Sequence, residues 1–280
     1  MSIILDLVES TVREITTEAA TAEITLSIGA AGAAAIVASL VADRWRPARS
    51  LGHTTVRRLV RAVAVLVMFI ELAAHASSSG WLTGEDAAVL DWFTTHRSPG
   101  WTTVARVITT VGDPMGIAVL GLAVATVLAW RARSAVPMVL VLGIVAVSSA
   151  TSTITKGLVG RARPPAAVQL MSETDLAFPS GHVTGATALA GAVALVYLSA
   201  HRSAVRRVVA VVLVVVVALV VSVTRLYLGV HWLTDVAGGA VLACSVVLIG
   251  AAVQPYLGSV LRRPRRHTDA ADAPFAGHST

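Results

Sequence analysis

Basic residues and histidines come together in two short stretches of the second half of the chain. The first, KGLVGRARPP at 156–165, opens with Lys156, the only lysine of the sequence. If the preceding helix continues through it, Lys156 and Arg163 lie about two turns apart on one face. A compact ammonium beside a bidentate guanidinium suits a multiply charged oxyanion such as phosphate. Taken alone, this stretch is better explained by cations that contact lipid headgroups beside an apolar segment.

The same region closes with the sequence FPSGH at 178–182, directly ahead of an apolar block. Ser180 is placed to cap the following helix, whose free backbone amides and positive dipole end favour an anion. Gly181 lets a ligand approach the backbone closely, and His182 adds a titratable group. A helix cap beside an incidental histidine explains this stretch alone about as well.

The second stretch places Arg225, His231 and Asp235 at the start of the last apolar block. On a helix, His231 and Asp235 are about one turn apart, so the carboxylate reaches one imidazole nitrogen. This contact fixes the tautomer and leaves the other nitrogen as a nucleophile. A histidine–aspartate pair that only caps the helix is the alternative, and this stretch alone does not decide between the two.

Composition places both stretches in a membrane protein. Hydrophobic residues make up 55% of the 280 residues, charged residues make up 14%, and the mean hydropathy is +0.76. A soluble globular domain has about 25% charged residues, so a soluble enzyme is excluded. The apolar residues gather in seven blocks near the length of a membrane-spanning helix. These blocks cover 24–42, 59–76, 114–130, 134–155, 183–200, 208–224 and 236–256.

The distribution of basic residues predicts the orientation of the spans. Most of the 22 basic residues fall in alternate connections between the blocks, and such an excess stays on the cytoplasmic side. We therefore expect a multi-pass protein of the cell membrane with its N-terminus outside and its C-terminus in the cytoplasm. Both chemical stretches then lie on the extracytoplasmic face. The net charge of +6 marks this topology, and no nucleic-acid partner is expected.

The predicted fold is all-α, a polytopic membrane helical bundle in three parts. Residues 1–58 form an N-terminal extension with one candidate span and a basic cytoplasmic loop, and 59–256 form the core. Residues 257–280 form a basic cytoplasmic tail that is expected to be disordered. In the long external connection, short amphipathic helices are expected on the membrane surface at 87–93 and 102–111.

One acidic residue, Glu71, stands inside an apolar block, where a carboxylate is costly. His75 is about one turn away, so pairing with His75 or exposure at the membrane interface is the expected explanation. A role toward a substrate or in proton transfer is the alternative. The single cysteine, Cys244, excludes an intrachain disulfide.

Three patterns follow one another along the chain, each at the external end of an apolar block: Lys-x6-Arg-Pro, Pro-Ser-Gly-His and Arg-x5-His-x3-Asp. Together they resemble the type 2 phosphatidic acid phosphatase family over roughly residues 59–256. The resemblance implies a six-helix membrane phosphatase core, preceded here by one extra apolar helix, that uses no metal and no other cofactor. The family has Ser before the last Arg, where this chain has Thr224, whose hydroxyl can make the same hydrogen bond.

The resemblance also implies a role for each matched residue. His231 resembles the nucleophile that forms a phosphohistidine, Asp235 its orienting residue, and His182 the acid that protonates the leaving oxygen. The implied phosphate cradle comprises Lys156, Arg163, Ser180, Gly181 and Arg225. Arg161 is not a motif position, and we expect it to contact a lipid headgroup. The expected partners are membrane lipids and a lipid phosphate or diphosphate substrate.

The implied activity is hydrolysis of a lipid phosphomonoester or an isoprenyl diphosphate. The candidate substrates are undecaprenyl diphosphate, which the family expectation slightly favours, phosphatidic acid and phosphatidylglycerol phosphate. A membrane transporter or a non-catalytic membrane protein is the alternative, but solute pathways need polar groups near the bilayer midplane. Vanadate-dependent haloperoxidases share the cradle, but they are soluble. The sequence leaves the lipid tail and the oligomeric state open.

Overall fold

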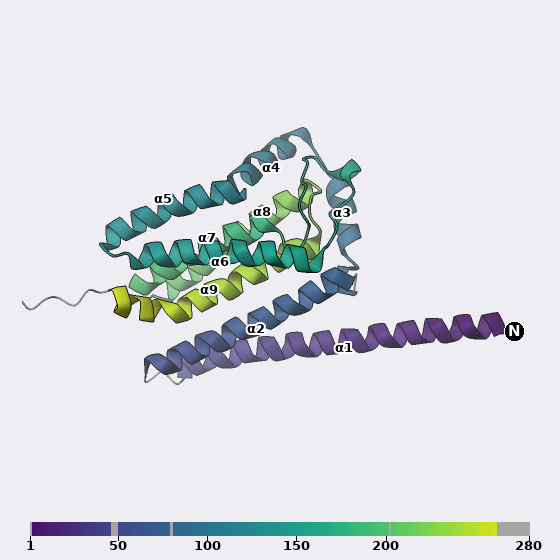
Figure 1. The fold of residues 1–280 in the computed structure, drawn as a ribbon, viewed down its shortest axis with the longest axis horizontal. Coiled ribbons are helices and arrows are strands. Elements are labelled where there is room, and N and C mark those ends of the chain that lie inside the picture. Colours follow the sequence, from purple (N-terminus) through teal and green to yellow (C-terminus); the bar gives the residue numbers. More distant parts are fainter. Residues whose placement is uncertain (1, 46–49, 79–80, 202, 262–280) are drawn as a thin grey trace, which may run out of the picture.

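The computed structural model describes residues 2–45, 50–78, 81–201 and 203–261 (Figure 1). Over these ranges the chain forms nine α-helices and two short 3-10 helices and contains no β-strand. In chain order the elements are α1 Ser2–Trp45, α2 Leu51–Ser78, η1 Trp81–Thr83, α3 Asp86–Thr95, α4 Pro99–Val111, α5 Pro114–Ala132, α6 Val136–Val159, η2 Ala166–Val168, α7 Gly181–Ala200, α8 Ala204–Tyr227 and α9 Leu233–Leu261.

Seven helices of the described chain are long and apolar enough to cross a bilayer, which confirms the predicted spans. They are Ala22–Asp43 within α1, and α2, α5, α6, α7, α8 and α9. Most extend beyond the apolar blocks, as α2 does through Arg57 and Arg58. This extension is expected because arginine favours helix almost as strongly as leucine does.

The central helix of the bundle is α7, which packs against α5, α6, α8 and α9 (Figure 1). Its first turn approaches α9 most closely at Gly239. A Cβ atom on Gly239 would lie only 2.7 Å from the carbonyl oxygen of Ser180. A larger residue there would push the two helices apart, so this glycine sets the position of Ser180 against α9.

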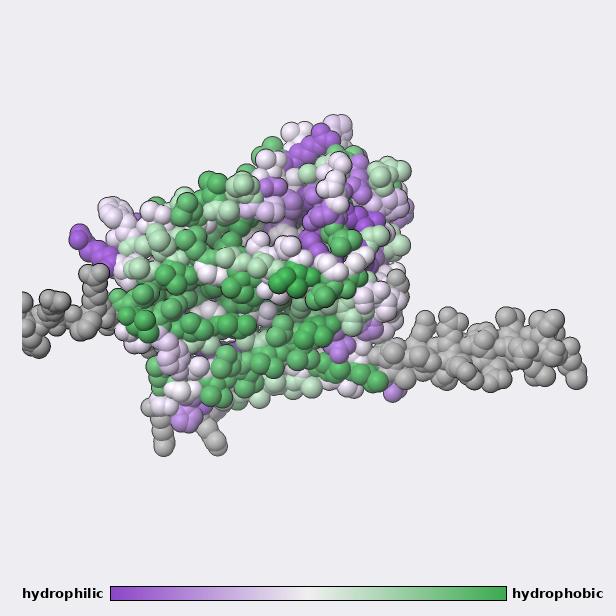
Figure 2. All heavy atoms as spheres, viewed as in Figure 1, coloured by the Kyte–Doolittle hydropathy of each residue, from purple (hydrophilic) through white to green (hydrophobic). Residues whose placement is uncertain are grey.

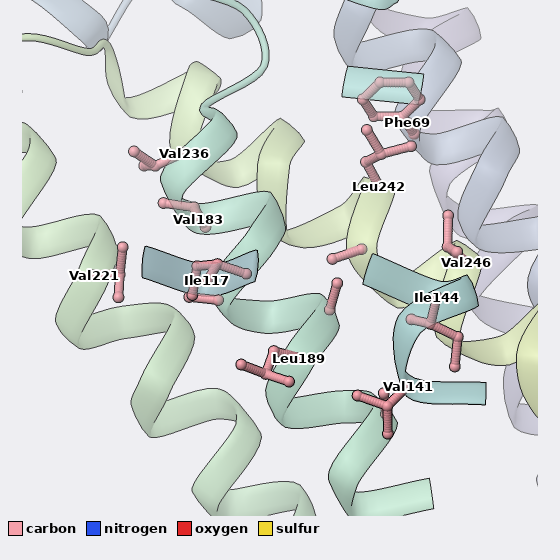
Figure 3. Packing of buried hydrophobic residues seen from close by; sticks show 14 of the residues in the cluster. Phe69, Ile117, Val141, Ile144, Val183, Leu189, Val221, Val236, Leu242 and Val246 are labelled. Carbon is pink, nitrogen blue, oxygen red and sulfur yellow. The ribbon is translucent and has the colours of Figure 1, made fainter. Parts of the chain in front are cut away.

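The six helices α2 and α5–α9 share one apolar core, which Figure 3 shows from close by. Phe69, Ile144, Leu189 and Leu242 come from four different helices and pack into this cluster. Lipid tails are as apolar as these side chains, so close packing, and not exclusion from water, stabilises the arrangement. The predicted six-helix core is confirmed.

The extra N-terminal helix, α1, lies along α2 outside this core, and its N-terminal part extends beyond the bundle (Figure 1). The predicted pair between Glu71 and His75 is wrong. His75 Nε2 instead lies 2.8 Å from Thr25 Oγ1 of α1, and His75 Nδ1 has no partner among the described residues. Glu71 is partly exposed, which agrees with the other explanation that the sequence offered.

Polar and apolar side chains are segregated along the bundle. Figure 2 shows a broad apolar band over the helices and a polar region at the end where α3, α4 and the long loops lie. The short helices predicted at 87–93 and 102–111 are present as α3 and α4, each somewhat longer than expected. Pro99 is the first residue of α4, directly after its N-cap Ser98.

Helix α9 continues to Leu261, so residues 257–261 of the predicted tail are helical, and 262–280 lie outside the described residues. Pro255 stands inside this helix. Because proline has no N–H, the Ala251 carbonyl loses its helical donor. Arg58 of α2 donates a hydrogen bond to this carbonyl instead. A hydrogen bond from α2 thus replaces the one that α9 lacks at Pro255.

Candidate active site

The predicted site residues come from three segments: the end of α6 with the following loop, the start of α7, and the connection from α8 to α9. The structure brings all three to the end of the bundle where α3 and α4 lie (Figure 1). The residues that line one cavity of about 860 Å³ are Lys156, Arg163, Gly181, His182 and His231. The others, Ser180, Arg225 and Asp235, are fully buried beside them.

Helix α6 ends earlier than the first basic stretch led us to predict. Gly160 takes a left-handed φ of 66°, which closes the helix after Val159. Arg163 therefore lies in the loop and does not share a helix face with Lys156. The two cations still meet, because Lys156 Nζ lies 3.1 Å from Asp175 Oδ2 and Arg163 forms an ion pair with Oδ1 of the same carboxylate.

His231 lies in the turn ahead of α9, whereas the prediction placed it on a helix with Asp235. The reason is that α9 begins only at Leu233. The contact between the two side chains is nonetheless made, with His231 Nδ1 3.3 Å from Asp235 Oδ2. The other ring nitrogen, Nε2, lies 3.2 Å from Arg163 Nη1. The turn thus directs one nitrogen toward the carboxylate and the other toward a cation of the cradle.

Burial and positive charge keep the His231 ring neutral. Its side chain is only 1% exposed. Burial lowers the pKa of His231 well below the usual 6.5, and the charges of Arg225, Arg163 and Lys156 lower it further. A neutral ring that donates its Nδ1 proton to Asp235 keeps a lone pair on Nε2. Nε2 can therefore act as a nucleophile at neutral pH.

The start of α7 presents backbone and a buried hydroxyl to the site. Ser180 stands at the N-cap position, as predicted, but its hydroxyl makes no capping hydrogen bond. This oxygen is fully buried and has no partner among the residues that the structure describes. Ser180 N donates to the Asp235 carbonyl over 3.0 Å, which fixes α7 against α9. The hydroxyl and the helix N-terminus can both bind an anion.

Arg225 lies near the C-terminal end of α8 and is completely buried. It donates to Thr109 Oγ1 of α4 over 2.6 Å and forms an ion pair with Glu173. Its Nη1 also lies 3.4 Å from His182 Nε2, so it stands directly behind the second histidine. The hydroxyl of Thr224 bonds to a carbonyl within α8.

Two carboxylates that sequence reasoning missed bind the cations of the cradle. Asp175 binds Lys156 and Arg163, and Glu173 binds Arg225. Burial alone would raise the pKa of Asp175, but attraction to Lys156 and Arg163 outweighs it, and the pKa falls below 3.8. The sequence did contain a signal for these two carboxylates. Clustered cations need counter-charges, and Glu173 and Asp175 are the acidic residues of the same loop.

Arg161, which was expected to contact a lipid headgroup, points inward. Its guanidinium donates to Asp235 Oδ1 over 2.7 Å and forms an ion pair with Asp86 of α3. Sequence reasoning also missed Asp86, which is 4% exposed. Spacing alone could not show which of the two neighbouring arginines, Arg161 or Arg163, lines the cavity, and in the structure it is Arg163. The structure gives them different partners.

This arrangement suits the transfer of a phosphoryl group. A neutral imidazole nitrogen stands next to three cations, a buried hydroxyl, a helix N-terminus and a second histidine, all beside one cavity. These are the groups that stabilise the charge of a transferring phosphate and exchange its protons. Within the described ranges, no three His, Cys, Asp or Glu side chains gather as potential metal ligands.

Comparison with known proteins agrees with this geometry. Residues 137–259 match the PAP2 superfamily, and the segment contains every predicted site residue. The fold resembles the crystal structure of a transmembrane PAP2-type phosphatidylglycerolphosphate phosphatase from Bacillus subtilis, with a TM-score of 0.59 and 24% identity over 73% of this chain and 98% of that one. No curated protein sequence matches the chain. Residues 137–259 are thus similar to the PAP2 superfamily, and they lie in a chain whose described residues include seven helices long and apolar enough to cross a membrane.

Proposed function

We propose that the chain hydrolyses a lipid phosphate through a phosphohistidine at His231. The observation that carries the proposal is the ring itself, with Nδ1 held by Asp235 and Nε2 beside Arg163. In the first step, Nε2 bonds to phosphorus, the bond from phosphorus to the leaving oxygen breaks, and His182 gives that oxygen a proton. In the second step, His182 takes a proton from water, the water oxygen attacks phosphorus, the P–N bond breaks and phosphate leaves.

The cradle lowers the barrier to both steps. Lys156, Arg163 and Arg225 offset the negative charge of the phosphoryl oxygens, and the Ser180 hydroxyl and the Gly181 amide donate hydrogen bonds. The unpartnered, buried Ser180 oxygen supports this role, because an anion would supply its missing acceptor. These groups already lie beside the cavity before the substrate arrives, and Lys156 and Arg163 exchange Asp175 for the phosphate when it binds.

The course of the cavity supports a lipid substrate. From the site, the cavity continues between α5 and α6 past Ser152 to Leu142. At a rise of 1.5 Å per residue, Leu142 lies about 21 Å along α6 from Lys156. A hydrocarbon tail in this space would place its phosphate at the cradle. The candidate substrates are an isoprenyl diphosphate, phosphatidic acid and phosphatidylglycerol phosphate, and hydrolysis of a panel of these lipids separates them.

We also propose that the site opens on the extracytoplasmic face, with the N-terminus outside and the C-terminus in the cytoplasm. The distribution of arginines in the connections supports this orientation. In that arrangement the substrate phosphate is exposed outside the cell while its tail remains in the outer leaflet. The products are the dephosphorylated lipid, or its monophosphate from a diphosphate, and inorganic phosphate.

The test is phosphate release by the detergent-solubilised full chain in excess chelator. We expect the wild type to release phosphate from lipid phosphates and His231→Ala to release none. His96→Ala is the matched control, because His96 is an exposed histidine directly after α3 that does not line the cavity, and it should match the wild type. A wild type that transports a lipid or solute without hydrolysis would favour the transporter alternative and contradict the proposal.

A further inference from the structure

The carboxylate of Asp235 is held on two sides. On one side, Oδ2 faces His231 Nδ1 and accepts a hydrogen bond from Trp232 N over 2.8 Å. On the other side, Oδ1 accepts a hydrogen bond from Arg161 over 2.7 Å. Because the side chain is completely buried, these contacts, and not water, set its orientation.

Arg161 is in turn anchored by Asp86, the first residue of α3. The two side chains form an ion pair, and Asp86 also accepts hydrogen bonds from Thr234 N over 2.9 Å and from Thr234 Oγ1 over 2.8 Å. The ring of Trp232 covers the guanidinium, with 5.7 Å between its centre and the guanidinium carbon. Arg161 is therefore fixed in position between two carboxylates and an aromatic ring.

We propose that Asp86 and Arg161 are positioning residues that hold Asp235, and through it His231, in the reactive orientation. This inference rests on the proposed function, because it takes His231 as the nucleophile. Neither residue lines the cavity beside the cradle. Both act on the direction of the Asp235 carboxylate, which decides which nitrogen of the His231 ring carries the proton.

The geometry gives each residue a separate task. Arg161 supplies a fork that binds Asp235 and Asp86 at the same time, which a single ammonium cannot reproduce with the same geometry. Asp86 keeps that fork from turning toward the cradle, where Arg163 already stands. Asp86 also lies outside the segment 137–259 that matches the superfamily, so the external helix α3 contributes to the site from beyond it.

The first test measures kcat and KM for three variants. Asp86→Asn keeps an oxygen acceptor for Thr234 but loses the charge that holds Arg161, and we expect kcat to fall about 10²-fold. KM should change by less than about threefold, because the cradle is intact. Arg161→Lys keeps the charge without the fork and should retain more kcat than Arg161→Met. Asp91→Asn is the matched control, since Asp91 is an exposed carboxylate of the same helix and should match the wild type.

The second test does not depend on turnover. Nitrogen NMR of the ¹⁵N-histidine-labelled protein in detergent reports the tautomer of His231, whose signals are identified by their loss in His231→Ala. We expect a ring protonated only at Nδ1 in the wild type and a mixture of tautomers in Asp86→Asn. Wild-type kcat in Asp86→Asn would overturn the inference. A fall in kcat with an unchanged His231 spectrum would also overturn the inference, because the substitution would then act on the stability of the protein and not on the His231 tautomer.

The two proposals fail in different ways. If the wild type and His231→Ala release phosphate equally, the proposed function is wrong, whatever Asp86→Asn does. If His231→Ala is inactive while Asp86→Asn keeps the wild-type kcat and tautomer, only the positioning role is wrong.

Discussion

At the scale of single residues, the state of the His231 ring follows from its surroundings. Burial removes the water that would stabilise an imidazolium, and Arg225, Arg163 and Lys156 repel a further positive charge. The Asp235 carboxylate lies beside Nδ1 of the ring. It favours the neutral tautomer that carries its proton on Nδ1. The proposed nucleophile, His231 Nε2, therefore needs no separate base to deprotonate it.

This state predicts the acid side of the pH profile. Because the pKa of His231 is lowered, the ring stays neutral as the pH falls through 6.5, and activity should be retained there. We expect kcat/KM to fall only at a pH clearly below 6.5, when Nε2 becomes protonated. The measurement is kcat/KM from pH 4 to 9 with a soluble phosphate ester. An acid limb at or above pH 6.5 would contradict the account.

A second residue-scale prediction concerns Asp175, which binds the cations that would bind phosphate. An arriving phosphate competes with this carboxylate for Lys156 and Arg163. Its side chain is 54% exposed, so its pairing is worth only about 1 kcal/mol after solvent screening. We therefore expect Asp175→Asn to lower the inhibition constant of orthovanadate, a phosphate mimic, by about fivefold. Asp91→Asn should leave that constant unchanged, and an unchanged or higher constant in Asp175→Asn would refute the competition.

At the scale of elements, the sequence predicted what local patterns determine. The hydropathy blocks located the spans because a bilayer demands a nearly fixed helix length. The helix expected at 102–111 is present as α4, but it begins earlier, at Pro99. The end of α6 was missed, since the spacing from Lys156 to Arg163 fits a continuing helix as well as a loop. Only the left-handed Gly160 decides between these conformations, and glycine adopts a helical conformation too.

The contact between α2 and α9 gives a prediction at this scale. Arg58→Met leaves the Ala251 carbonyl without the donor that replaces the missing N–H of Pro255, at a cost of about 1–2 kcal/mol in the free energy of unfolding. In a Pro255→Ala background the helix supplies its own donor, so the same change should cost less. A double-mutant cycle of unfolding in detergent measures the difference. Equal costs in both backgrounds would show that Arg58 does not stabilise the protein through the Ala251 carbonyl.

At the scale of the whole molecule, the site depends on contacts that no local pattern contains. Arg161 meets Asp86 as well as Asp235 because α3 packs against α9. Motif spacing predicted that Lys156, His182 and His231 would meet, since each stands at the same end of a span. It could not predict Asp86, because a carboxylate in a short helix between two spans has the same local sequence whether it faces water or an arginine.

Orientation in the membrane is the prediction at this scale. In a Cys244→Ser background, a membrane-impermeant maleimide should label Thr174→Cys in intact cells, because the loop after α6 is proposed to lie outside. Ser203→Cys, in the connection from α7 to α8, should be labelled only after lysis. The opposite pattern would place the site in the cytoplasm and would reverse the proposed topology.

The most direct test of the account is covalent labelling of His231. With a ³²P-labelled substrate that has a good leaving group, His182→Ala should accumulate an acid-labile phosphoryl group, because the first step proceeds and the water-activating histidine of the second is missing. The label should map to His231 and be absent from the His182→Ala, His231→Ala double variant. Equal labelling of the double variant, or a label on any other residue, would contradict the central claim.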